Sequence, residues 1–153
     1  THMSIPPNID RFNKTTLFIF DLLYQAFPVP ITLDVSNIAM NTLPEGASYE
    51  QSFESIEPVH HAIVFLQKEG FINYGNRTLD GETFHLAILT SKSLALLGNI
   101  PSSLEPNISV SDKIRNAVKG GIKQAGAEAV RQIIGLVLKN TPSVVESAGG
   151  LSV

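Results

Sequence analysis

The chain has 153 residues, of which 43% are hydrophobic and 16% are charged, and its formal net charge at pH 7 is −3. These proportions are ordinary for a globular protein with a buried core. The absence of cysteine excludes disulfides, thiolate metal sites and cysteine nucleophiles, and the absence of an apolar run of about 18 residues excludes a predicted membrane-spanning helix.

The charge is divided unevenly along the chain. Residues 1–106 hold five Lys/Arg and eleven Asp/Glu, a net charge of −6, whereas residues 107–153 hold six and three, a net charge of +3. Thr1-His2-Met3 is interpreted as the remnant of a cleaved tag, and residues 1–9 as that remnant and a flexible N-terminus. No signal peptide follows, so a cytoplasmic protein is expected.

The first predicted element is a helix that begins near Asp10 and ends before Pro28 and Pro30. Proline lacks the backbone donor and restricts the residue before it, so the pair stops the helix. Its apolar positions recur every three or four residues. A short helix is predicted around residues 33–40, and residues 41–51 are predicted to form a loop because they combine Pro, Gly, Ser and Asn.

A second long helix is expected from about Glu57, with Gly70 in the left-handed position after its end. Residues 71–74 and 83–89 alternate as strands do, and Asp80-Gly81 supplies the turn between them. Thr90 is predicted to cap a further helix that Gly98 ends.

This order of helix, short helix, helix, hairpin and helix resembles the winged helix-turn-helix proteins, including the MarR- and PadR-like families. Those families close the third helix with L-x-K-x-G-x-I and open the helix after the wing with L-T-x-x-G. Here the matching segments are Leu66 to Ile72 and Leu89 to Ser93, with Ser93 in place of the glycine. The resemblance covers residues 10–100. It implies an α+β, mostly helical fold: a winged helix-turn-helix domain (10–106) with a two-stranded wing.

In DNA-binding members the third helix enters the major groove and the wing contacts the backbone, where Lys and Arg supply affinity. The side chains expected at the corresponding surface here are candidates for contacting DNA or a partner: Ser52, Glu54, Ser55, Glu57, His61 and Arg77. Arg77 is the only basic residue among them. This composition favours a protein partner over DNA.

Residues 107–141 are expected to form a long C-terminal amphipathic association helix, capped at Ser111, and residues 142–153 a disordered tail. The predicted association stripe has an eleven-residue repeat, and consists of Ile114, Val118, Ile122, Ala125, Ala129, Ile133 and Leu136. Arg115, Lys119 and Lys123 form a basic stripe. Its partner could be the acidic domain of this or another copy, DNA phosphates or an anionic membrane. The lack of aromatic residues makes the membrane the weakest of these.

No catalytic signature, cofactor motif or metal-ligand spacing is present, and no small-molecule ligand is indicated, so we expect no enzyme. His60 and His61 are adjacent on a helix and point about 100° apart, which is unsuited to chelating one metal ion. The sequence therefore favours a non-catalytic regulatory or adaptor protein that acts through protein association, with homo-oligomerisation or partner docking by the C-terminal helix. The alternative is a dimeric DNA-binding transcriptional regulator.

Overall fold

The computed structural model of the protein describes residues 5–43, 46–100 and 108–138. Its elements, in chain order, are α1 (Pro7–Ala26), β1 (Ile31–Asp34), α2 (Val35–Thr42), α3 (Tyr49–Glu54), α4 (Ile56–Lys68), β2 (Ile72–Asn73), β3 (Asn76–Arg77), β4 (Thr83–Leu89), α5 (Ser91–Gly98), α6 (Val110–Lys119), the 3-10 turn η1 (Ile122–Gln124) and α7 (Ala127–Leu138). The described chain is thus α+β and mostly helical, as the sequence predicts. None of its helices has the length and apolar character needed to cross a bilayer.

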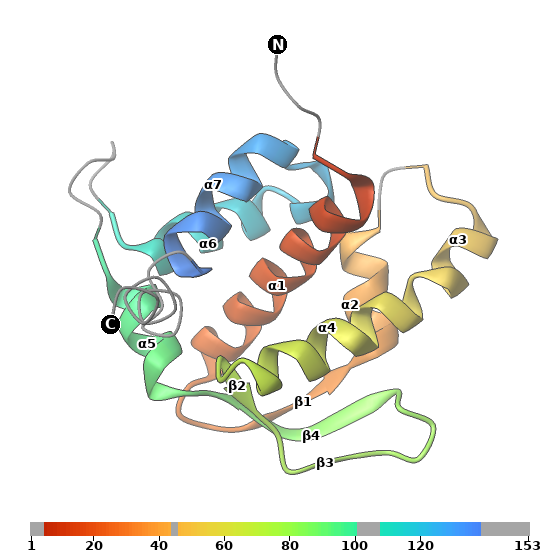
Figure 1. The fold of residues 1–153 in the computed structure, drawn as a ribbon, viewed down its shortest axis with the longest axis horizontal. Coiled ribbons are helices and arrows are strands. Elements are labelled where there is room, and N and C mark those ends of the chain that lie inside the picture. The colour runs from red at the N-terminus through yellow and green to blue at the C-terminus, as the bar shows by residue number, and fades with distance from the viewer. Residues whose placement is uncertain (1–4, 44–45, 101–107, 139–153) are drawn as a thin grey trace, which may run out of the picture.

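Helix α1 lies at the centre of the molecule, with α6 and α7 on one side, α4 on the other and the sheet at one end (Figure 1). Its central turns are buried on nearly every side, and Leu17, Ile19 and Phe20 have no exposed surface. The helix begins at Pro7, which suits the first helical position because its missing donor would be unpaired there. The predicted start at Asp10 is therefore wrong by three residues.

The sheet is antiparallel, and β4 is its central strand: β1 pairs with one side of β4, and β2 and β3 pair with it as well. The predicted hairpin is confirmed, with Gly81 at a φ of +74° in the turn. The sequence does not predict β1, which adds a further strand to the predicted hairpin. Leu86 in β4 has a φ of +60°, and this local distortion lies opposite the gap between β2 and β3.

The side-chain cap predicted at Thr90 is confirmed, and two further caps were not predicted. Asp34 accepts a hydrogen bond from the backbone N–H of Asn37 and caps α2, whose position agrees with the predicted short helix. The loop expected over residues 41–51 instead gives way to α3 at residue 49. Ser48 and Gln51 form a reciprocal capping box, whose side chains satisfy each other's backbone N–H groups.

The segment after β4 hydrogen-bonds to the backbone carbonyls of the three residues that follow α4. Thr90 Oγ1 donates to the carbonyl of Gly70 at 2.7 Å, Lys92 Nζ donates to that of Glu69 at 2.7 Å, and Ser93 Oγ donates to that of Phe71 at 2.5 Å. Ser93 is fully buried. The serine at the position where the resemblance implies a glycine thus adds a hydroxyl donor to the Phe71 carbonyl.

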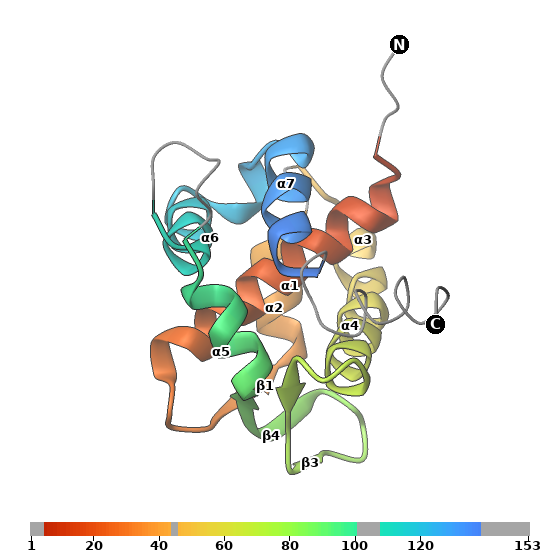
Figure 2. The same ribbon diagram turned by 60° about the vertical axis from the view of Figure 1, so that its left-hand side comes forward.

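The predicted continuous C-terminal helix is wrong. Gly121 has a φ of +95°, which breaks the helical path after α6, and α7 begins only at Ala127 after η1. The two helices pack against α1 and against each other (Figure 2). The cap of α6 is Ser109 rather than Ser111, which lies inside the helix and is buried. The predicted domain boundary at residue 106 and the predicted tail over residues 142–153 lie outside the described residues.

One hydrophobic core joins the N-terminal and C-terminal parts of the chain. Side chains of α6, η1 and α7 lie in the same buried cluster as those of α1, α2, α4 and the sheet. The buried members from the C-terminal elements are Val110, Ile114, Ile122, Val130, Ile134 and Val137. The helical break thus lets one segment fold back over α1 and bury two apolar faces against it.

Candidate interaction surfaces

The sequence-predicted contact residues lie on two elements, the α3–α4 arm (residues 49–68) and the β3–β4 hairpin. Glu54, Glu57 and His61 are exposed on the α3–α4 arm, and Arg77 is exposed on β3. Ser55 is fully buried, so its assignment to the solvent-facing surface is wrong. It occupies the junction between α3 and α4, as the residue that follows one helix and precedes the other. The side chain of Ser52 lies outside the described part of the structure.

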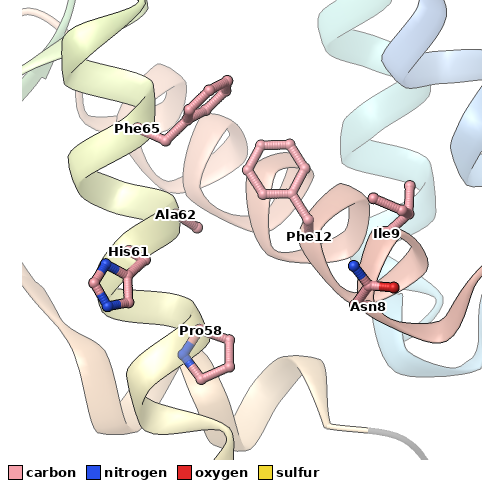
Figure 3. A pocket seen from close by; sticks show the side chains of 7 residues that line it. All are labelled: Asn8, Ile9, Phe12, Pro58, His61, Ala62 and Phe65. Atoms are coloured by element: carbon pink, nitrogen blue, oxygen red, sulfur yellow. The ribbon is translucent and has the colours of Figure 1, made fainter.

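An apolar groove of about 460 Å³ lies between α1 and α4. Its lining residues are Asn8, Ile9 and Phe12 from α1, and Pro58, His61, Ala62 and Phe65 from α4 (Figure 3). The rings of Phe12 and Phe65 meet edge to face, with centroids 5.5 Å apart, where the two helices approach each other. Ile9 and Phe65 each keep 44% of their surface exposed. We call this the α1–α4 groove.

Sequence reasoning missed most of this groove. Ile9 was placed before the first helix, and Phe65 lies off the buried face of α4, which consists of Val59, Ala62, Ile63 and Leu66. The available signal was the presence of two large apolar residues outside the core-facing positions of their helices. Such positions are normally polar on a helix whose outer face contacts only water.

The hairpin turn is held by one carboxylate. Asp80 Oδ1 accepts from Thr78 Oγ1 at 2.5 Å and from the backbone N–H of Glu82 at 3.0 Å. Thr78 Oγ1 in turn accepts from the backbone N–H of Thr83 at 3.2 Å. The hydrogen bond from Thr78, followed by that from Glu82, lowers the pKa of Asp80 below its usual value.

His60 connects α4 to this turn. Its Nδ1 lies 2.9 Å from the carbonyl oxygen of Gly81, and its Nε2 lies 3.3 Å from Arg77 Nη1. The His60 ring also packs against Phe84 of β4, with centroids 5.2 Å apart, and against His61 at 5.5 Å. The two histidines thus face different surroundings: His61 lines the α1–α4 groove, and His60 contacts the hairpin.

The basic stripe is not one uniform surface. Arg115 Nη1 donates to Asp21 Oδ2 of α1 at 2.6 Å, and the Asp21 side chain is only 5% exposed. Lys119 and Lys123 are exposed. For Arg115, the acidic partner expected from the sequence is therefore a carboxylate of the same chain.

The predicted association stripe is used largely inside the molecule. Ile114 and Ile122 are buried, and only Ala129 is exposed. The four others are partly buried and pack against the core: Val118, Ala125, Ile133 and Leu136. Self-association through this stripe stays a prediction, and Ile114 and Ile122 are not accessible to a partner in this fold.

The described residues contain no group of three or more His, Asp or Glu side chains placed to hold a metal ion. No protein-family model, curated protein or solved structure matches the chain. The interaction surfaces must therefore be interpreted from their own chemistry.

Proposed function

We propose that this protein is a non-catalytic regulatory or adaptor module that binds an amphipathic helix of another protein in the α1–α4 groove. The observation that carries the proposal is the groove itself, where Ile9 and Phe65 stay 44% exposed on opposite walls. Its volume of about 460 Å³ falls within the range of about 300–1,000 Å³ that ligand pockets occupy. Grooves between helices commonly take an apolar helix face, whose anchors repeat every three or four residues.

Charge indicates which kind of helix would fit. Glu50, Glu54 and Glu57 are all exposed on the α3–α4 arm, whose N-terminal part of α4 forms one wall of the groove. A helix with apolar residues on one face and Lys or Arg beside them would complement both features. Complementary charge of this kind speeds association and excludes acidic competitors.

A second copy of this chain is a poorer occupant. The basic helix α6 buries Val110 and Ile114 in its own core, so it has no free apolar face to insert. Residues 139–153 contain one Lys and one Glu and therefore lack the basic flank. The predicted homodimer stays a separate prediction, which light scattering of the full chain would test.

Selection from an unbiased library of displayed helical peptides tests the proposal. We expect ligands with apolar residues at three- and four-residue spacing and with flanking Lys or Arg. Phe65→Ala and Ile9→Ala should each weaken binding by about 30-fold, as for a central interface residue worth about 2 kcal/mol. Met40→Ala on α2 is the matched control, because Met40 is 60% exposed and lies outside the groove. Ligands that bind the Phe65→Ala variant equally well would overturn the proposal.

The order α1, β1, α2, α3, α4 and then the hairpin supports a second candidate, a winged helix-turn-helix protein that binds DNA. In that architecture α4 would be the reading helix and β3–β4 the wing. The acidic residues exposed on α3 and α4 argue against phosphate contact. Measurable binding to random duplex DNA at about 50 mM salt would favour this candidate, because non-specific phosphate contacts give affinity there.

A further inference from the structure

A second, smaller cavity adjoins the α1–α4 groove. It has a volume of about 90 Å³ and shares Asn8, Phe12 and Pro58 with the groove (Figure 3). Its other lining residues are Arg11 and Thr15 of α1 and Val59 of α4. Whereas the groove is lined mainly by apolar side chains, this cavity adds a cation and a hydroxyl group. We call it the Arg11 cavity.

The guanidinium of Arg11 is not used inside the fold. Arg11 is half-buried, yet in the part of the chain that the structure describes it has no hydrogen-bond or ion-pair partner. The carboxylate of Asp10, next to it in the sequence, is paired instead with Lys14 Nζ at 3.1 Å. Because a guanidinium has five donors and no acceptor, Arg11 remains available to an acceptor that a ligand supplies.

The hydroxyl of Thr15 is a second unused donor. Thr15 lies one turn further along α1 than Arg11 and therefore on the same face. Only 4% of Thr15 is exposed, and its hydroxyl has no hydrogen-bond partner among the described residues. By contrast, the equally buried Thr42 donates to the carbonyl of Ile38 at 2.9 Å. Since a buried hydroxyl without a partner is unfavourable, an acceptor in the cavity would be stabilised there.

We propose that the Arg11 cavity binds the carboxylate of an Asp or Glu side chain on the amphipathic helix whose apolar residues occupy the α1–α4 groove. This inference rests on the proposed function of the groove. An ionised carboxylate is purely an acceptor, and it pairs with a guanidinium through two parallel hydrogen bonds. Its remaining acceptor capacity matches the Thr15 hydroxyl. Arg11 is thus a specificity-determining residue, because an apolar or basic side chain at this point would leave both donors unpaired.

The cavity gives the groove two borders of opposite charge. Arg11 lies on the α1 side, and the exposed glutamates of the α3–α4 arm lie on the α4 side. The bound helix should therefore carry its carboxylate towards α1 and its Lys or Arg residues towards the α3–α4 arm, which fixes how it lies in the groove. Because the two cavities share Phe12 and Pro58, the carboxylate and the nearest apolar anchor should be three or four residues apart.

A double-mutant cycle with the tightest-binding selected peptide tests the cavity. Changing the peptide carboxylate to the corresponding amide should weaken binding to the natural chain about tenfold, as for the loss of a charged hydrogen bond. The same change should alter binding to Arg11→Met by no more than about twofold. Arg11→Gln serves in its place if Arg11→Met does not fold. Arg131→Met, on α7 and outside both cavities, is the matched control and should keep the tenfold effect.

Thr15→Val removes the unpartnered hydroxyl at nearly constant volume and should weaken binding of the acidic peptide about threefold, as for one neutral hydrogen bond. It should leave binding of the amide peptide nearly unchanged if the hydroxyl acts on the carboxylate. Circular dichroism of each variant checks that its fold is kept.

The outcomes separate the cavity from the groove. Selected peptides that depend on Phe65 but show no preferred Asp or Glu would overturn the carboxylate site and leave the groove proposal intact. The same is true if the amide change has equal effects on the natural chain and on the Arg11 variants. Peptides that bind Phe65→Ala as tightly as the natural chain would instead overturn the groove proposal, and selection of no peptide would overturn both.

Discussion

The ion pair between Asp21 and Arg115 joins residues 94 positions apart, across the α1–α6 contact. The Asp21 carboxylate is almost fully buried, whereas 43% of the Arg115 side chain is exposed. A buried carboxylate without its partner carries the cost of leaving water uncompensated. Loss of the pair would therefore leave a buried carboxylate uncompensated at the contact between α1 and α6.

Replacing Arg115 by methionine should lower the free energy of unfolding by about 1–3 kcal/mol, because Asp21 would stay buried without its hydrogen bond. Urea denaturation measures this change. Arg131→Met is the matched control, since Arg131 pairs with Glu128 at the surface, where an ion pair contributes little to stability. Equal destabilisation by the two variants would show that burial of Asp21 has no part in the effect.

At Asp80 the prediction concerns pH. Its pKa is lowered from the ordinary value of 3.8, first by the hydrogen bond from Thr78. Because the pKa of Asp80 is lower in the folded protein than in the unfolded chain, its ionised carboxylate stabilises the fold at pH values above the ordinary pKa. This stabilisation is lost as the pH falls through the pKa of the folded state. Carboxyl ¹³C titration should place Asp80 below 3.8, and Thr78→Val should raise its pKa. An unchanged pKa in Thr78→Val would contradict this interpretation of the turn.

At the scale of elements, the break between α6 and α7 depends on Gly121. Its φ of +95° is a conformation that residues with a Cβ rarely adopt. Gly121→Ala should therefore reduce the free energy of unfolding by about 1–2 kcal/mol. Gly120→Ala is the control, because Gly120 has a φ of −79°. If both variants are equally stable in thermal denaturation, the break does not require a glycine.

Local chemistry explains which elements could be predicted. Gly70, Asp80-Gly81 and Thr90 act within a few residues of their own position, and each has the predicted role. The start of α3 was missed although its Ser48 capping box is also local, because the surrounding Pro and Gly residues favoured a loop. The strand β1 could not be predicted, since its four residues become a strand only by pairing with β4.

The prediction of one continuous C-terminal helix failed because the spacing of apolar residues fits two different arrangements equally well. A long straight helix and two short helices folded over α1 both place apolar residues every three or four positions. Gly120 and Gly121 lower helix propensity, but only the tertiary packing of Ile122 and Val130 on the core makes a break favourable. The same packing removes the association surface that the longer helix would have exposed.

At the scale of the whole molecule, the acidic α3–α4 arm and the basic helix α6 lie on different sides of α1 (Figure 1). The α3–α4 arm with its exposed glutamates lies on one side of α1, and α6 with Lys119 on the other. The candidate groove was invisible to sequence reasoning because it requires α1 and α4, almost fifty residues apart, to lie side by side. The fold thus places an apolar groove beside the acidic flank, which is the basis of the proposed partner chemistry.

Methyl spectra of the isoleucine-labelled chain, titrated with the tightest-binding selected peptide, test this central claim most directly. The account predicts that the Ile9 Cδ1 resonance shifts most, because Ile9 forms an exposed wall of the groove. Buried Ile38 and Ile114 should stay in place, and Phe65→Ala should suppress the shift of Ile9. An unchanged Ile9 resonance at saturating peptide, with shifts concentrated instead at Ile31 and Ile88 of the sheet, would contradict it.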